Sequence, residues 1–457
     1  MAHPQDREIV RLAFPAFLAL VAEPVFLLSD AAIVGHLGTP ELAGLGIAAV
    51  VLQTVVGLCV FLAYGTTSSV ARHLGAGDLR GALAQGIDGL WLAVLIGIAA
   101  TVGGVLLTGP LVAAFGAGAE VTGFATTYLR LAFLGTTPLL LMLAATGVLR
   151  GLQDTRTPLV VAVGGNALNI ALNLLLVFGL GPVPALGIAG SALGSVLAQV
   201  ASAAALTVVV VRGARRHGAS LAPDRAGISA AARAAVALVI RTVTLRAALL
   251  VTTYAVVVST RETGLGPVSL ATHQLAFTIW TFQAFVLDAI AIAAQAITGR
   301  YLGAGDIDGT RAVTRRMIRW GLVGGAVLGV ATIAISPLLG PLFTEDAAVR
   351  DLLVPVLVVV GLSLPVCGVV FVLDGVLIGA GDGTYLAKAG LLVLAVYAPV
   401  VLGVALLADG PDGPAGESAL VWVWVAFSVV LMGARAGVLL HRERGDAWLV
   451  TGVRTPS

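Results

Sequence analysis

The chain has 457 residues, of which 58% are hydrophobic and only 11% are charged, and its net charge is +2. A soluble domain carries roughly a quarter charged residues, so this composition excludes a soluble protein. A transmembrane helix needs about 20 apolar residues, so the length accommodates about twelve spans with short connectors and leaves too few residues for a separate soluble domain.

Apolar runs bounded by Gly, Pro and charged residues predict twelve transmembrane helices. Their expected ranges, in chain order, are 9–37, 42–68, 81–108, 120–146, 158–180, 186–211, 235–260, 269–298, 311–336, 346–376, 385–407 and 418–440. The N-terminal segment runs into the first helix without a small-residue cleavage site, so we expect an uncleaved helix rather than a signal peptide. The expected fold class is an all-α integral membrane protein.

The connectors between these helices alternate between charged and nearly charge-free segments. The charged ones are 70–80, 149–157, 212–233, 299–319 and the tail after 440, whereas 109–119 and 181–185 carry almost no charge. Lys and Arg concentrate in the cytoplasmic loops of membrane proteins. We therefore expect a multi-pass protein of the plasma (inner) membrane with both termini in the cytoplasm.

An internal repeat relates the two halves of the chain. The segment His73-Leu-Gly-Ala-Gly-Asp78 recurs as Tyr301-Leu-Gly-Ala-Gly-Asp306, and Gly147-Val-Leu-Arg-Gly-Leu-Gln-Asp154 recurs as Gly375-Val-Leu-Ile-Gly-Ala-Gly-Asp382, both at an offset of 228 residues. Halves with an even number of spans enter the membrane in the same sense. The repeat therefore predicts two parallel six-helix halves, residues 1–228 and 229–457, around a central cleft.

Asp30, within the first predicted helix, is the first candidate functional residue. A carboxylate inside an apolar helix is costly and normally faces a cavity or a proton relay. Apolar surroundings favour the protonated acid, so we expect Asp30 to take up a proton on one side of the membrane and release it on the other. The alternative is that Asp30 is only a buried hydrogen-bond anchor between helices.

Three asparagines lie on one face of the helix predicted at 158–180. Asn166, Asn169 and Asn173 are spaced at i, i+3 and i+7, so their amides are able to meet Asp30 across the bundle. An amide oxygen accepts a hydrogen bond from a protonated acid or ligates a cation. Asn side chains also hold transmembrane helices together by hydrogen bonding, so both roles stay open.

Two further residues of the first helix lie near Asp30. Glu23 precedes it by seven residues, which is two turns on nearly the same face, and is a candidate relay. Pro24 removes one backbone hydrogen bond, so we expect a kink that serves either as a hinge beside the acid or as a passive bend. The corresponding positions of the second half, Val251 and Val258, are apolar. The site that takes up and releases the proton is therefore expected in the first half.

The second half carries its own intramembrane charges. Asp288 and Asp374 are acids within predicted spans, and Arg246 is a base within the span at 235–260. An ion pair between Arg246 and one of the acids would satisfy both charges. We favour this structural pairing over a role of these residues in proton uptake and release. Four aromatic residues either line a cleft for flat cations or pack between helices: Phe61, Tyr64, Trp280 and Phe282.

Several of these segments resemble the multidrug and toxic compound extrusion (MATE) family. Asp30-Ala-Ala-Ile-Val-Gly-His-Leu-Gly38 resembles the family's Asp, four residues, then Gly-x-Leu-Gly at the end of the first helix. Leu245-Arg-Ala-Ala-Leu-Leu250, Leu287-Asp288 and Leu373-Asp-Gly-Val-Leu-Ile-Gly379 are similar to the DNA-damage-inducible protein F (DinF) branch. The resemblance implies an efflux antiporter that takes up protons or sodium ions while it expels amphipathic, often cationic compounds through a V-shaped central cleft.

The chain departs from the family at one important position. The family pattern in the fifth helix is Leu-Asn-x-x-Leu-Asp, whereas this chain has Leu168-Asn-Ile-Ala-Leu-Asn173. A monovalent cation gains less from an amide than from a second carboxylate, so this loss favours protons over sodium as the coupling ion. Residues 231–261 contain no acid, so the helix 7 Glu of the sodium-coupled NorM-type branch is also missing.

Other classes of protein fit the sequence less well. A lipid-linked precursor flippase would need several cationic residues in its cavity, but the arginines are peripheral except in the span at 235–260. A membrane transferase would need paired acids, and no Asp-Asp-x-x-Asp stretch, metal-binding Cys/His cluster or nucleophile elbow occurs. We therefore expect no enzyme, no cofactor and no metal. The expected partners are a small-molecule substrate and the lipid bilayer, without nucleic acid, for a monomeric chain.

Overall fold

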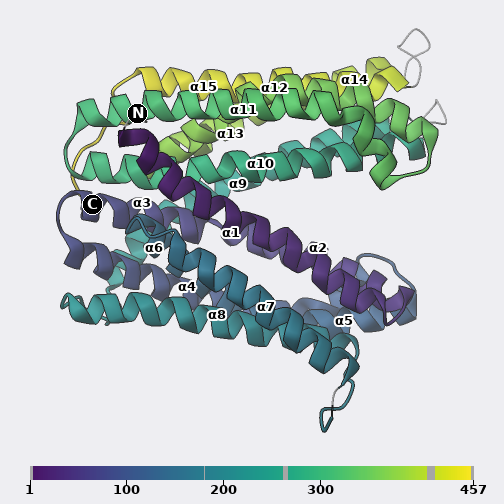
Figure 1. The fold of residues 1–457 in the computed structure, drawn as a ribbon, viewed down its shortest axis with the longest axis horizontal. Helices are drawn as coiled ribbons and strands as arrows, with labels where there is room; N and C mark the ends of the chain where they lie inside the picture. The colour runs from purple at the N-terminus through teal and green to yellow at the C-terminus, as the bar shows by residue number, and fades with distance from the viewer. Residues whose placement is uncertain (1–3, 180, 261–265, 409–416, 454–457) are drawn as a thin grey trace. The chain divides into compact units, whose positions relative to one another are not determined.

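The computed structural model describes residues 4–179, 181–260, 266–408 and 417–453, most of which lie in helices (Figure 1). The helices of the first half are α1 (Pro4–Gly35), α2 (Thr39–Cys59), α3 (Phe61–Gly75), α4 (Leu79–Ala113), α5 (Ala119–Phe133), α6 (Thr136–Gly151), α7 (Arg156–Phe178) and α8 (Ile188–Arg216). Those of the second half are α9 (Arg225–Val258), α10 (Gly266–Gly303), α11 (Ile307–Phe343), α12 (Ala347–Gly379), α13 (Gly383–Ala408), α14 (Glu417–Val425), the π-helical segment η1 (Ala426–Leu431) and α15 (Met432–Arg444).

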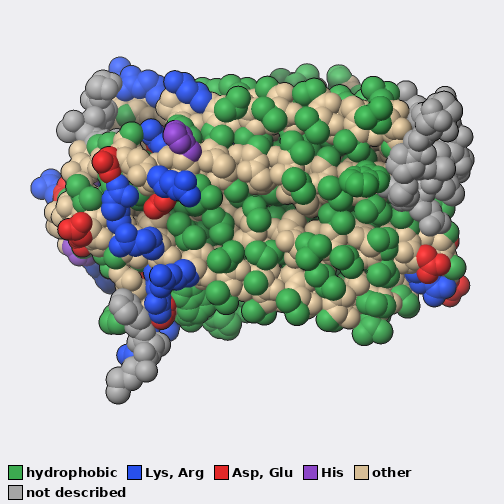
Figure 2. Space-filling view, turned by 90° about the horizontal axis from the view of Figure 1, so that it is seen from above, with side chains coloured by type: hydrophobic (Ala, Val, Ile, Leu, Met, Phe, Trp, Pro, Cys, Tyr) green, Lys and Arg blue, Asp and Glu red, His purple; other side chains and the backbone are tan. Residues whose placement is uncertain are grey.

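The helices confirm the predicted number of spans. Within the described residues, 11 helices are long and apolar enough to cross a membrane, and the number is 12 when α5 and α6, which meet at a bend of 48°, count as one span. Helices α2 and α3 form a single span, Thr39–Gly75. On the face shown in Figure 2, hydrophobic side chains cover the middle of the helices and Lys and Arg side chains lie near helix ends. This is the surface that a bilayer requires.

Several helices are longer than the sequence predicted. Helix α8 continues to Arg216 and α9 begins at Arg225, so the connector expected at 212–233 shrinks to residues 217–224. Arginine side chains keep their charge in water while their aliphatic stems lie along apolar surface. Helices α8 and α9 therefore extend past the apolar runs from which their ends were predicted.

The contacts between residues divide the chain into two compact units. The first, called here the C unit, contains Met1–Ala13, Ala237–Thr298 and Asp306–Val450, and the second, the N unit, contains Phe14–Val236, Gly299–Gly305 and Thr451–Ser457. Each unit has its own apolar core, which includes Trp280, Trp424 and Phe427 in the C unit and Tyr128 and Phe133 in the N unit. That residues 1–228 and 229–457 act as the two moving halves stays a prediction.

The repeated Leu-Gly-Ala-Gly-Asp segments form equivalent turns. Asp78 caps α4 by accepting a hydrogen bond from the backbone N–H of Gly81 at 2.8 Å, and Asp306 caps α11 by accepting one from Gly309 at 2.7 Å. The glycine before each Asp has a positive φ, 76° and 75°, which glycine adopts without strain. The repeated acids at these turns therefore serve as helix caps.

The same segments contain a close backbone contact within the N unit. A Cβ atom on Gly75 would overlap the backbone carbonyl of Arg300, and one on Gly303 would overlap the backbone carbonyl of Arg72. Arg72 and Arg300 are related by the 228-residue offset, so the contact is symmetric. Glycine permits this approach because it has no side chain.

Candidate functional site

Asp30 lies on α1 inside the N unit, and only 4% of its surface is exposed. Its carboxylate accepts hydrogen bonds from three other helices. Asn173 on α7 donates to Oδ1 at 2.8 Å, Ser191 on α8 donates to Oδ1 at 2.5 Å, and Tyr128 on α5 donates to Oδ2 at 2.9 Å. Asp30 is therefore the point at which four helices of the N unit meet.

Two glycines of α8 bring this helix close to α7. A Cβ atom on Gly190 would overlap the backbone of Leu176, and one on Gly194 would overlap the side-chain oxygen of Asn173. A spacing of four residues between small side chains lets two transmembrane helices approach closely. As a result, the Ser191 hydroxyl reaches the acid on α1.

The hydrogen-bond network extends from Asp30 along α7 and α8. Asn173 Nδ2 lies 3.3 Å from Asn169 Oδ1, and Asn169 Nδ2 donates to Ser195 Oγ at 3.0 Å. The side-chain oxygen of Asn173 is buried, and no donor among the described residues reaches it. Because the two ends of an amide exchange by a simple flip, Asn173 has an acceptor to offer if Asp30 becomes protonated.

The electrostatic balance at Asp30 has two opposing contributions. Neither Asn173, Ser191 nor Tyr128 carries a charge, but their three donors stabilise the ionised carboxylate, because hydrogen bonds to a charged acceptor are about twice as strong as neutral ones. The apolar core beside the acid, which includes Val34, favours the neutral form. The hydrogen bonds therefore favour the ionised acid, whereas the apolar surroundings favour the neutral one.

The structure brings together only some of the residues predicted to act with Asp30. Asn173 contacts the acid directly and Asn169 contacts Asn173, but Asn166 instead donates to the backbone oxygen of Ala22 at 2.6 Å. This contact fastens α1 to α7 just before Pro24. Helix α1 continues unbroken through Pro24, whose role as a hinge stays a prediction.

The side chain of Glu23 lies outside the described residues, so its predicted relay role stays open. Tyr128, Ser191 and Ser195 escaped the sequence analysis, because single hydroxyl residues are common in apolar helices. The one available signal was the pairing of Ser191 and Ser195 at i, i+4 with the neighbouring glycines, since that pattern places two hydroxyls on the close-packed face of α8.

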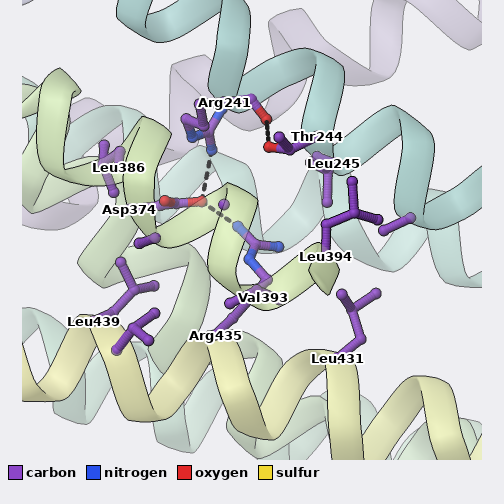
Figure 3. A pocket seen from close by; sticks show the side chains of 14 residues that line it. Arg241, Thr244, Leu245, Asp374, Leu386, Val393, Leu394, Leu431, Arg435 and Leu439 are labelled. Atoms are coloured by element: carbon purple, nitrogen blue, oxygen red, sulfur yellow. Dashed lines mark hydrogen bonds and ion pairs between the residues drawn. The ribbon is translucent and has the colours of Figure 1, made fainter. Parts of the chain in front are cut away.

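In the C unit, Asp374 on α12 forms ion pairs with two arginines (Figure 3). Arg241 on α9 donates to its Oδ2 atom at 2.6 Å, and Arg435 on α15 donates to the same oxygen. Arg246, which we expected to neutralise one of the second-half acids, is exposed. The arginines that pair with Asp374 are therefore Arg241 and Arg435, and a pairing of Arg246 with Asp288 stays a prediction. Arg241 and Arg246 are five residues apart and so lie about 140° apart around α9.

Asp288 and three of the predicted aromatic residues differ in how far they are exposed. Asp288 is half-buried on α10. Trp280 packs edge-on against Phe427 in the core of the C unit, with ring centroids 5.2 Å apart. Phe61 is buried, whereas Phe282 is 51% exposed. Trp280 is therefore a packing residue of the apolar core. Within the described residues, no group of three His, Cys, Asp or Glu side chains is arranged to hold a metal ion.

Comparisons with known proteins place this geometry in context. The MatE family matches residues 15–175 and 227–402. The chain is 32% identical over 400 residues to the chloroplastic protein DETOXIFICATION 44 of Arabidopsis thaliana, which covers 84% of this chain and 74% of that protein. It is 28% identical over 455 residues to DNA damage-inducible protein F of Escherichia coli, which covers 97% and 94%.

Solved structures share the fold. A crystal structure of a MATE protein in the straight conformation superposes with a TM-score of 0.83 at 20% identity and covers 97% of both chains. A Vibrio cholerae MATE transporter in its bent form also gives 0.83 at 20% identity and covers 97% of this chain and 98% of that one. The resemblance expected from the sequence motifs is confirmed.

Proposed function

The chain belongs to the MATE family of multidrug efflux transporters, and we propose that it is a secondary active antiporter that exports small amphipathic or cationic compounds in exchange for protons. The observation that carries this proposal is Asp30, an acid buried at the junction of four helices and held by three neutral donors. Ionisable residues inside a membrane are costly and usually serve a functional role, such as a proton relay.

The proton acts through the hydrogen bonds that hold α1. When Asp30 is ionised, Tyr128, Ser191 and Asn173 fasten α1 to α5, α8 and α7. Protonation removes the charge and turns one carboxylate oxygen into a donor, so the charge-assisted bonds weaken and the donors must reorient. The position of α1 then depends on the proton, and alternating access between the two halves becomes coupled to proton entry.

The same geometry favours protons over sodium ions. The donors on Asn173, Ser191 and Tyr128 all direct hydrogen atoms at the carboxylate, and a sodium ion would have to displace them. With Asn at position 173, the only formal charge in this hydrogen-bonded group is that of Asp30. Sodium coupling is the competing outcome of the transport experiment below.

We further propose a location and a set of partners for this activity. The location is the plasma (inner) membrane, and the positive-inside pattern of the connectors supports an orientation with both termini in the cytoplasm. The partners are a small-molecule substrate and the lipid bilayer, without nucleic acid, and the working form is a monomer. The activity needs no cofactor, because the proton is the coupling ion.

The test is Asp30→Asn in proteoliposomes with an imposed pH gradient. The amide cannot exchange a proton, so efflux of a fluorescent cationic dye driven by the gradient is expected to stop, while the protein still expresses and folds. Ser29→Ala is the matched control, because the Ser29 hydroxyl is exposed and donates a hydrogen bond to the backbone oxygen of Val25 in its own helix. Full proton-driven efflux by Asp30→Asn would refute the role of Asp30.

A further inference from the structure

The first turns of α11 carry two arginines on an exposed face of the C unit. The guanidinium group of Arg316 donates to Asp6 of α1, with Nε 2.7 Å from Oδ1. Arg315 and Arg319 are exposed, and among the described residues neither has a hydrogen-bond or ion-pair partner. A spacing of four residues corresponds to about 40° around a helix, so these two cations lie side by side.

The same face of α11 continues into apolar side chains. Three valines follow Arg319 at intervals of three or four residues and are 61%, 64% and 69% exposed: Val323, Val327 and Val330. Exposed apolar side chains within a membrane span face the hydrocarbon. Trp320 lies between the arginines and the valines, and tryptophan is enriched at the membrane–water interface. Arg315 and Arg319 therefore lie at the level of the lipid headgroups, next to a lipid-facing stripe.

Helix α1 adds a second pair of arginines to the same unit. Arg7 and Arg11 are exposed and four residues apart, and within the described chain they also have no hydrogen-bond or ion-pair partner. Val10, on the same face, is exposed as well. Asp6 fastens this end of α1 to α11, because it also accepts a hydrogen bond from Trp320 Nε1 at 2.8 Å.

The two pairs of arginines lie on the outside of the contact between α1 and α11. The inward faces of both helices are buried in the C unit, through Ile9 and Leu12 on α1 and Val313 and Met317 on α11. The exposed faces therefore point away from the core of the unit. We call the four exposed arginines the basic surface: Arg7, Arg11, Arg315 and Arg319.

We propose that the basic surface binds the phosphate headgroup of an anionic phospholipid, whose acyl chains lie along the valines of α11. Guanidinium groups form charge-assisted, often bidentate hydrogen bonds with phosphate, and basic clusters beside a membrane span attract anionic lipids. A lipid uses both the cations and the apolar stripe that continues from them. An acidic peptide in water would use only the cations, so the continuity of the two surfaces favours a lipid.

The test measures lipid binding, so its outcome does not depend on proton coupling at Asp30. The purified full chain in a non-ionic detergent is titrated with short-chain phosphatidylglycerol, and with phosphatidylcholine of the same chain length as the neutral comparison. Native mass spectrometry counts the bound lipids, and the unfolding temperature reports binding because a ligand of the folded state stabilises it. Inorganic phosphate and a polyglutamate peptide are titrated in parallel.

Phosphatidylglycerol is expected to bind saturably and more tightly than phosphatidylcholine, and added salt should weaken it. Arg315→Gln is expected to weaken binding about fivefold, and the double variant Arg315→Gln/Arg319→Gln about 25-fold. Arg315→Lys/Arg319→Lys should keep most of the affinity because it keeps the charge. Arg225→Gln, which removes an exposed arginine of the N unit, is the charge-matched control and leaves the affinity unchanged, as does Asp30→Asn.

The proposal is overturned if the two lipids bind equally well, or if the double glutamine variant binds phosphatidylglycerol as tightly as the natural chain. An equal loss in Arg225→Gln would show general attraction to a positive protein instead of a site. Inorganic phosphate that binds as tightly as the lipid would exclude a role for the acyl chains. Saturable binding of polyglutamate without binding of phosphatidylglycerol would assign the surface to an acidic peptide. If the double variant does not fold, the two single variants decide, with the same fivefold loss expected for each.

Discussion

The amide of Asn173 donates a hydrogen bond to the carboxylate of Asp30 at 2.8 Å, across the interface between α7 and α1. The amide thus occupies the position at which the family pattern, Leu-Asn-x-x-Leu-Asp, has a second acid. We therefore propose that the side chain at position 173 decides the coupling ion, and restoring the acid tests this proposal.

Asn173→Asp is expected to make efflux respond to sodium. A second carboxylate beside Asp30 doubles the negative charge of the site and offers a sodium ion the hard oxygen ligands that the amide lacks. Dye efflux from proteoliposomes, driven by a sodium gradient alone at equal pH, measures the effect. Asn166→Asp is the control, because Asn166 contacts Ala22 instead. Sodium-driven efflux by the natural chain would contradict the proposed proton coupling.

Tyr128 is expected to contribute to stability through the charge on Asp30. A hydrogen bond to a charged group contributes about 1.5–3 kcal/mol. Tyr128→Phe should therefore destabilise the natural chain but have much less effect in the Asp30→Asn background. Unfolding free energies of the four proteins in a double-mutant cycle give the coupling energy. A coupling energy near zero would show that the Tyr128 hydroxyl does not interact with an ionised Asp30.

Gly75→Ala is expected to destabilise the N unit. Its Cβ would overlap the carbonyl oxygen of Arg300, and overpacking of this kind costs about 1–3 kcal/mol. Gly65→Ala lies in the same helix, where a Cβ meets no atom within 4 Å, and it should be neutral or stabilising. Thermal unfolding in detergent compares the two. Equal unfolding temperatures for both variants would argue against the symmetric glycine contact.

Cysteine labelling is expected to report the proposed orientation. Ala76 lies in the connector between α3 and α4 and Ala114 in the one between α4 and α5, and both are exposed. A membrane-impermeant maleimide added to intact cells should label Ala114→Cys but label Ala76→Cys only after the membrane is opened. The natural thiols, Cys59 and Cys367, are buried and give a low background. The reverse labelling pattern would invert the proposed topology.

Much of the fold was predictable because its determinants are local. The apolar runs set the number of spans, since each helix must cross a bilayer of fixed thickness. The 228-residue offset placed Asp78 and Asp306 at equivalent turns, and both are helix caps in the structure. Asp30 was identifiable from the sequence, because an acid inside an apolar helix is rare whatever surrounds it.

The partners of the buried charges were decided only by the tertiary structure. Tyr128 and Ser191 reach Asp30 from α5 and α8, and nothing in the sequence near Asp30 specifies them. Arg435, rather than Arg246, reaches Asp374 because helix rotation and the π turns of η1 determine which face of each helix meets its neighbour. Hydropathy shows that a residue lies within a membrane span, but the partner that it meets depends on how separate helices pack.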